Sequence, residues 1–317
     1  MGIRNQNIAS DANIELHKLQ GGGQATGLSF LASAKRPSGD IQGKVFYVNG
    51  DGGSDSNSGL TPDAPYATIN KARSVAAGRI NWSGSPWANS DEIKVWPGVY
   101  AESFNGGLYG VNLQGLGWHH DINGQNGVTI KAADGITWDA TSHINSVIAN
   151  ICFHAPADNG TEACFQADNF NRMLMMDCTF QGVPGASPTT TRGFEVVKDM
   201  TGSMLLRCIF KQIRNSVYLV ADNANSKQIT GDGFEDLTIL GGDQTGVYFD
   251  VNSTNTLCWM KYCTIGGGGS TLALGLDDNS GNCVVSWTTF EATACDPASG
   301  DGDSHYNGCY LNGSLMT

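Results

Sequence analysis

A four-residue pattern between residues 150 and 290 constrains the fold more than any other feature of the sequence. It has the form x-apolar-x-(Phe or Ile), and its six copies end at Phe153, Phe180, Phe210, Ile239, Ile265 and Phe290. These ends lie 27, 30, 29, 26 and 25 residues apart. A repeat of this period predicts a solenoid, in which each repeat packs only against its neighbours.

The alternation within the pattern predicts which side chains face the core. Successive side chains of a strand point to opposite faces, so the second and fourth positions of each copy share one face. The fourth positions are the aromatic or Ile ends given above. The second positions form another column, made of Ile151, Cys178, Cys208, Leu237, Cys263 and Thr288.

A second short strand can be aligned in each repeat. The aligned segments are Cys164–Gln166, Phe194–Val196, Val217–Leu219, Val247–Phe249 and Ala273–Gly275. Two strands in each period of ~27 residues, with intervening Gly, Asn and Asp clusters too short for helices, predict stacked β rungs. Leucine-rich repeats need a fixed Leu/Asn framework, and a propeller blade needs about 40 residues. We therefore expect an all-β parallel β-helix of about eight rungs over residues 93–317, with earlier rungs at 92–96, 110–113 and 127–131.

The segment before the rungs reads as a strand, a turn-rich loop and a helix. Residues 45–48 are the strand, and residues 50–59 are rich in Gly, Ser and Asp. Thr68 is a suitable N-cap for a helix whose apolar face includes Ile69 and Ala72 and which ends at Gly78. Because a solenoid exposes its first apolar rung, we expect this helix to cap it.

This opening resembles a known family. The runs at 46–50, 59–62, 65–72 and 93–102 are similar to the start of right-handed parallel β-helix proteins, the pectate-lyase-like superfamily. The resemblance implies a right-handed coil. It does not select a function, because the superfamily includes polysaccharide lyases and hydrolases, surface proteins, and the spikes and fibres of tailed phages.

Residues 1–44 do not follow the rung pattern. They contain a short amphipathic patch of Ile14, Leu16 and Leu19, followed by a Gly-rich stretch at 21–27. The segment is loosely similar to the N-terminal attachment segments of phage fibres and spikes. This similarity implies an arm that binds capsid or tail proteins through residues 1–40. The expected organisation is thus an arm (1–44), a capping region (45–92) and a β-helix (93–317).

Composition limits the partners and the compartment. The chain has 18 basic and 30 acidic residues, for a net charge of −12, which disfavours nucleic acid and anionic membranes as partners. We find no apolar run that could serve as a signal peptide or span a membrane, so we expect synthesis in a cytoplasm. The nine cysteines include no Cys-x-x-Cys pair and are expected to be reduced and buried.

The last rung pattern falls at residues 308–313, and no capping pattern follows it. An open rung leaves backbone groups and apolar side chains uncovered, so a partner is expected to cover it. The resemblance to phage spikes implies that the partner is a second copy, in a homotrimer.

A polar column offers the first candidate chemistry. It stands at the fifth residue after the start of each second strand and comprises Asn169, Asp199, Asp222, Asn252 and Asp278. With a rung rise of ~4.8 Å, Asp199 and Asp222 would lie about 5 Å apart. That separation suits the carboxyl pair of a retaining glycosidase or a shared Ca²⁺. The alternative is a ladder of turn-closing side chains, which needs no cofactor.

Tryptophans in the N-terminal half offer a second candidate. They could stack on sugars or pack the capping region and the first rungs. The residues are Trp82, Trp87, Trp96, Trp118 and Trp138.

Two functional hypotheses follow. The first is a phage virion protein, a trimeric spike or fibre whose arm attaches it to the particle and whose β-helix contacts a host-surface polysaccharide or protein. The alternative is a polysaccharide lyase or glycoside hydrolase of the same fold, with Asp199 and Asp222 as catalytic candidates. The sequence leaves open whether the protein is an enzyme.

Overall fold

The computed structural model describes residues 43–80, 91–117, 126–132, 136–155, 163–182, 192–219, 229–241, 244–249, 258–266, 272–278, 283–297 and 305–316. The chain divides into two units between Asp40 and Ile41, and the description that follows concerns the second unit. The predicted attachment residues Ile14, Leu16 and Leu19 lie outside the described residues.

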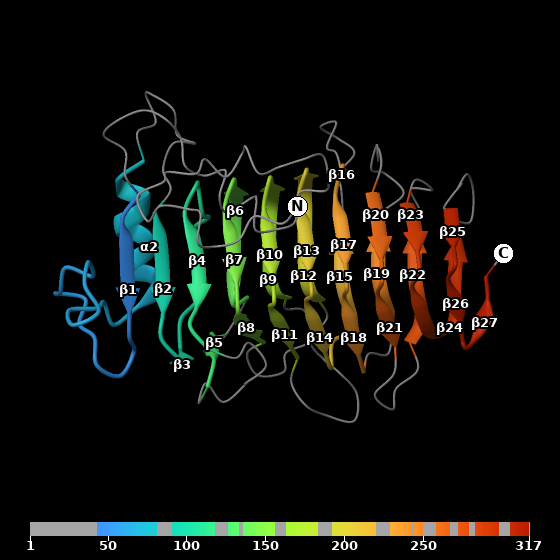
Figure 1. Cartoon of the computed structure of the whole chain (residues 1–317), viewed down its shortest axis with the longest axis horizontal. Helices are drawn as coiled ribbons and strands as arrows, with labels where there is room; N and C mark the ends of the chain where they lie inside the picture. The colour runs from blue at the N-terminus through green and yellow to red at the C-terminus, as the bar shows by residue number, and fades with distance from the viewer. Residues whose placement is uncertain are drawn as a thin grey trace, which may run out of the picture. The chain divides into compact units, whose positions relative to one another are not determined.

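The second unit is a parallel β-solenoid, as predicted. It has three sheets, whereas the sequence pattern predicted two strands in each period, because the strand that precedes each copy of the pattern, such as Leu174–Met176, was not recognised. The strands of sheet A lie side by side in one row (Figure 1). They are β1 (Val45–Val48), β2 (Glu92–Val95), β4 (Asn112–Gly115), β7 (Val147–Ala149), β10 (Leu174–Met176), β13 (Met204–Leu206), β17 (Gly233–Glu235), β20 (Cys258–Lys261), β23 (Cys283–Ser286) and β25 (His305–Asn307). Nine of these described strands fall after residue 91, one more than the predicted number of rungs.

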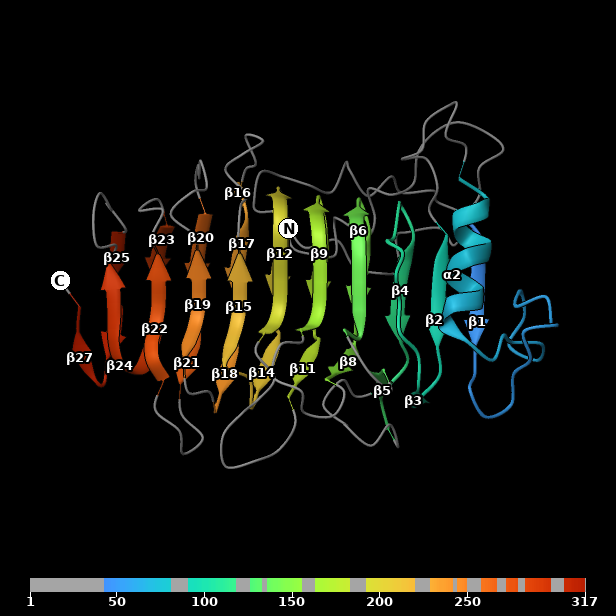
Figure 2. The same ribbon diagram turned by 180° about the vertical axis from the view of Figure 1, so that it is seen from behind.

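Sheets B and C form the other two faces. Sheet B contains β3 (Gly98–Tyr100), β5 (Val128–Lys131), β8 (Ile151–His154), β11 (Thr179–Gln181), β14 (Ile209–Lys211), β18 (Thr238–Leu240), β21 (Thr264–Gly266), β24 (Thr289–Pro297), β26 (Tyr310–Leu311) and β27 (Ser314–Leu315). Sheet C contains β6 (Trp138–Ile144), β9 (Ala163–Asn171), β12 (Arg192–Thr201), β15 (Asn215–Leu219), β16 (Ile229–Thr230), β19 (Thr245–Phe249), β22 (Leu272–Asp278) and the second part of β24. Figure 2 shows sheet C from its own side.

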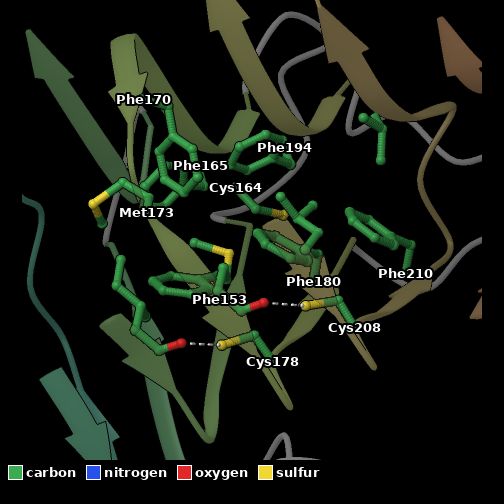
Figure 3. Packing of buried hydrophobic residues seen from close by; sticks show 14 of the residues in the cluster. Phe153, Cys164, Phe165, Phe170, Met173, Cys178, Phe180, Phe194, Cys208 and Phe210 are labelled. Atoms are coloured by element: carbon green, nitrogen blue, oxygen red, sulfur yellow. Dashed lines mark hydrogen bonds between the residues drawn. The ribbon is translucent and has the colours of Figure 1, made fainter. Parts of the chain in front are cut away.

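The two predicted apolar columns lie in the core. Every residue of both columns is at most 2% exposed. The strand register places Phe153 opposite Phe180 and Phe180 opposite Phe210. The rings of Phe180 and Phe210 stack with centroids 4.6 Å apart (Figure 3). The sequence pattern therefore identified the interior of sheet B correctly.

The first position of each pattern copy forms the corner between sheets A and B. All six corner residues have left-handed backbones, with φ between 51° and 57°. Adjacent rungs must turn in the same way for their strands to remain in register, so the corner repeats the same backbone conformation. The corner residues are Asn150, Asp177, Arg207, Asp236, Tyr262 and Trp287.

Helix α2 (Ile69–Gly78) begins and ends where the sequence predicts. It packs on β1 and β2, the first two strands of sheet A (Figure 2). The Thr68 hydroxyl caps it by accepting from Lys71 N, and the Glu102 carboxylate accepts from Ile69 N and Asn70 N at 2.9 and 2.8 Å. These bonds satisfy donors that the first turn of a helix leaves free. None of the described helices is long and apolar enough to cross a membrane.

The final rung differs from expectation. The chain turns back after β26, and β27 pairs with it antiparallel, Tyr310 opposite Leu315. All other strand pairs of the described sheets are parallel. The edge that the sequence leaves as an open rung in sheet B therefore carries one more short strand, which occupies hydrogen-bonding groups of β26.

The cysteines lie in the interior, as expected. All nine are free, and eight of them are buried. Cys178 and Cys208 occupy adjacent rungs of one column and contribute hydrogen bonds to main-chain carbonyls (Figure 3). Burial raises the pKa of the Cys178 and Cys164 thiols, which keeps them protonated and unreactive.

Candidate functional site

The predicted polar column is present in part. Asn169 and Asp199 lie opposite each other in β9 and β12. The Asn169 amide donates to Thr141 O and to Ser142 Oγ, both at 3.0 Å, which joins it to the preceding rung. These bonds are what a turn ladder requires.

The remaining members of that column do not join it in the described residues. Asp222 and Asn252 lie outside the described residues, so the predicted spacing of Asp199 and Asp222 stays a prediction. The strand register places Asp278 opposite Phe249. Leu276, and not Ala273, lies opposite Val247, so the sequence alignment of this rung was shifted by three residues. The inward apolar side chain sets the register, and Leu276 is the buried one.

The structure describes two of the five tryptophans that the sequence offers as a sugar-stacking surface, Trp96 and Trp138. Trp138 is fully buried and stacks on Phe104, with ring centroids 4.5 Å apart. Trp96 is half-buried and contacts Tyr47. These two side chains pack the capping region and first rungs, the second of the two predicted roles, and Trp82, Trp87 and Trp118 lie outside the described residues.

A different set of polar side chains lies on the outer face of sheet C, which we call the sheet C column. Its members occupy equivalent positions on six successive rungs. They are Asp139, Gln166, Glu195, Tyr218, Tyr248 and Asp277. Five of them, all except Asp277, lie between core residues of their strands, such as Phe194 and Val196 on either side of Glu195.

Arg192 organises the centre of this column. Its guanidinium forms an ion pair with the Glu195 carboxylate, three residues along the same strand. The same guanidinium lies 4.4 Å from the centroid of the Tyr218 ring on the next rung. Tyr218 in turn stacks on Tyr248, with centroids 4.6 Å apart. The contacts fix the guanidinium between a carboxylate and an aromatic face.

Two carboxyl groups of the column have raised pKa values. Glu195 is 4% exposed, and burial raises the pKa of its carboxyl, while the Arg192 guanidinium opposes the shift and the Asp139 charge adds to it. Burial also raises the pKa of Asp139, and the negative charge of Asp168 raises it further. Asp168 is itself paired with Lys198, whose Nζ lies 2.6 Å from its Oδ2.

The spacing of these two groups follows from the fold. Gln166 lies opposite both Asp139 and Glu195, so the two acids are two rungs apart. With ~4.8 Å for each rung, their backbones are separated by about 10 Å. Groups with perturbed pKa values that share one face in this way can transfer protons to and from a molecule between them.

Sequence reasoning missed Glu195 as a site residue although the strand Phe194–Val196 had been aligned. The alignment placed Cys164 one residue out of register, so Gln166 did not fall beside Glu195. The feature that could have identified it is the middle residue of each aligned three-residue strand. This residue must face outward when the residues on either side of it are in the core.

The described residues offer no metal centre. Within them, no group of three or more His, Cys, Asp and Glu side chains is placed to hold a metal ion. The Ca²⁺ alternative needed Asp222, which lies outside this set, and it stays a prediction.

No protein-family model and no curated protein matches the sequence. Solved structures do match in fold. A pectin methylesterase from Aspergillus niger superposes with a TM-score of 0.54 at 15% identity, covering 87% of this chain and 88% of the other. The pectin methylesterase PemA from Erwinia chrysanthemi gives 0.52 at 11% identity, covering 86% and 90%. At this identity the likeness shows the fold alone, and a right-handed coil is consistent with it.

Proposed function

We propose that the protein is a polysaccharide hydrolase whose active site is the sheet C column. The observation that carries the proposal is the pairing of a buried, arginine-bound carboxylate, Glu195, with a second carboxyl of raised pKa, Asp139, two rungs away. Enzymes named for a polysaccharide, the pectin methylesterases, share the fold and support the class of substrate.

The environments of the two acids suggest their roles. Glu195 pairs with Arg192 and acts as the base, and its raised pKa strengthens it in that role. Asp139 lies near the charge of Asp168, which favours its protonated form, so it acts as the acid. In glycoside hydrolysis the acid would protonate the leaving oxygen while the base takes a proton from water. A separation of two rungs leaves room for that water and predicts inversion of configuration.

The charge of the face favours an uncharged substrate. Arg192 and Lys198 are each paired with a carboxylate of this face. The column also contains Asp277, whose carboxylate would repel a polymer of uronic acids. We therefore expect a neutral polysaccharide.

The test measures release of reducing ends from a panel of neutral polysaccharides. Glu195→Gln and Asp139→Asn should each lower turnover by about 100-fold or more, as expected on loss of a general base or acid. The matched control is Asp199→Asn, in the same strand as Glu195 but outside the sheet C column, opposite Asn169. NMR of the first product should show the inverted anomer. Turnover that survives Glu195→Gln, or that disappears in Asp199→Asn, would show that the site is elsewhere.

We also propose that the protein is a virion component, a homotrimeric phage spike or fibre that contacts a host surface polysaccharide or protein. The amphipathic patch of Ile14, Leu16 and Leu19, in a segment without the rung pattern, supports an attachment role for residues 1–40. Deletion of residues 1–40 should abolish incorporation into particles and leave the β-helix folded. Light scattering should give about three times the monomer mass of 33.5 kDa. A truncated chain that still assembles onto particles would contradict the attachment role, and a monomer mass would contradict the trimer.

A further inference from the structure

Three aromatic side chains lie on the outside of the C-terminal rungs. Trp259 is in β20 between the buried Cys258 and Met260, so it faces away from the core. Tyr262 follows at the corner of the same rung, and Trp287 occupies the same corner one rung further. We call Trp259, Tyr262 and Trp287 the aromatic surface. Its members come from sheet A and from its corner with sheet B, so the surface is separate from the sheet C column.

The backbone at this corner makes the aromatic residues unexpected. Tyr262 has φ 57° and Trp287 has φ 51°. Bulky side chains are outliers in this left-handed region, which costs about 1–2 kcal/mol for each residue. The four preceding corners carry Asn, Asp, Arg and Asp. A bulky residue at such a position is expected only where burial or function offsets the strain.

Burial of these two side chains is only partial. Tyr262 is 50% exposed and Trp287 is 57% exposed. Val284, which lies opposite Trp259 on the next strand, is also exposed. The two strained residues therefore keep about half of their surface in water, which points to a role at the surface.

The two indole rings pack against glycines of the neighbouring rungs. A Cβ added to Gly308 would lie 2.7 Å from Trp287 Cε3, and one added to Gly233 would lie 2.3 Å from Trp259 Cζ2. Each ring therefore lies against the backbone of an adjacent rung, at a position that only glycine leaves open. Rings that are held in this way lose little freedom when a ligand binds.

Polar groups border the aromatic surface. Lys261 Nζ lies 4.6 Å from the centroid of the Tyr262 ring, and Ser286 lies opposite Lys261 in the next strand. Fixed aromatic faces with hydrogen-bond donors beside them suit a ligand that has both apolar C–H faces and hydroxyl groups. A sugar ring has this character.

We propose that the aromatic surface binds an uncharged polysaccharide, with sugar rings stacked on Trp287 and Tyr262. A corner is convex and cannot enclose a small molecule, whereas an extended chain can lie across several rings. The net charge of −12 disfavours an acidic polymer. The binding site is independent of the proposed hydrolase activity, because it uses none of the residues of the sheet C column.

The test is electrophoresis of the full chain in native gels that contain hydroxyethyl cellulose, galactomannan or polygalacturonate. We expect at least one neutral polymer to retard the protein. Trp287→Asn should weaken this binding about tenfold, a loss typical of one stacked aromatic. Trp287→Tyr should retain most of it. The matched control is Val99→Ala, a similarly exposed residue of β3.

The outcomes separate a sugar-binding surface from a subunit interface. Thermal unfolding of each variant shows that it is folded, which Trp287→Asn should be because Asn tolerates the left-handed corner. Retardation that is unchanged in Trp287→Asn, absent with both neutral polymers, or seen only with polygalacturonate would overturn the proposal. So would a fall in oligomeric mass on Trp287→Asn, since the surface would then be a subunit interface. Binding lost in Trp287→Asn and kept in Val99→Ala supports the proposal whether or not the protein hydrolyses the polymer.

Discussion

Two columns of the same repeat obey different rules. The fourth position of each pattern copy is a buried Phe or Ile, and its chemistry hardly changes over six rungs. The first position, three residues earlier, has an almost constant backbone, yet its side chains range from Asn150 and Arg207 to Trp287. Close packing dictates side-chain volume in the core, whereas the corner dictates only φ and ψ. Corners and outer faces are therefore where a β-helix can vary its function without losing its fold.

The largest effect should come from the interior column. Phe180→Ala removes a ring that stacks on Phe210 at 4.6 Å and contacts Phe153 at 5.5 Å. We expect a loss of ~3–5 kcal/mol in the free energy of unfolding, because the rigid rungs on either side cannot close the cavity. Urea denaturation measures this, with Asp177→Ala at the corner as the control. Equal losses in the free energy of unfolding for the two variants would contradict the difference between the interior column and the corner.

A buried carboxylate tests the other corner, between sheets C and A. Asp232 is fully buried, and burial raises its pKa to about 7, against the opposing hydrogen bonds from Ser203 N and Thr230 N. The folded state then binds a proton that the unfolded state loses near pH 4, so stability should fall as the pH rises from about 4 to about 7. Between pH 5 and pH 8 this loss is ~2–3 kcal/mol.

Asp232→Asn has no proton to lose and should lack this part of the pH dependence. Denaturation of both proteins at pH 5, 6, 7 and 8 measures it. The stability difference, wild type minus variant, should shrink steadily over the series. A difference that stays constant would mean that Asp232 remains ionised throughout.

A smaller effect is expected where glycine makes room for an aromatic corner. Gly308 has φ 65°, and a Cβ there would lie 2.7 Å from the Trp287 ring. Gly308→Ala should cost about 1–2 kcal/mol from the backbone and should displace the indole, which would alter its fluorescence. In a protein that already carries Trp287→Asn, Gly308→Ala should lower the free energy of unfolding only by the contribution of the left-handed backbone. Identical costs in the two backgrounds would show that the ring does not rest on Gly308.

The smallest effect is expected at an exposed part of the same corner. Arg207 Nε and Nη2 donate to the two carboxylate oxygens of Asp177, each at 2.7 Å. The pair is exposed to water, so Arg207→Ala should cost less than about 1 kcal/mol. The loss should shrink further in concentrated salt, because ions screen the pair. A loss as large as that of Phe180→Ala would contradict the view that corner side chains contribute little to the fold.

The repeat pattern predicted the core columns but not the alignment of the second strands. The period of the repeat located the core because every rung must place an apolar side chain at the same point, as at Phe153 and Phe180. The same period could not align the second strands, since loops of unequal length separate them and β12 carries a bulge between Val196 and Asp199. An error of one to three residues there moved Gln166 and Asp278 out of their true columns.

The sequence by itself determined the parallel β-helix, the capping helix at Ile69–Gly78 and the buried columns. These features depend on local patterns that repeat in every rung or lie within one helix. Only the tertiary structure decided that Glu195 and Arg192 pair beside Tyr218, and that Trp287 rests on Gly308. The contacts of Arg192 with Tyr218 and of Trp287 with Gly308 join residues of different rungs on the outer surface. There the apolar alternation constrains neither the identity of a side chain nor the neighbour it will meet.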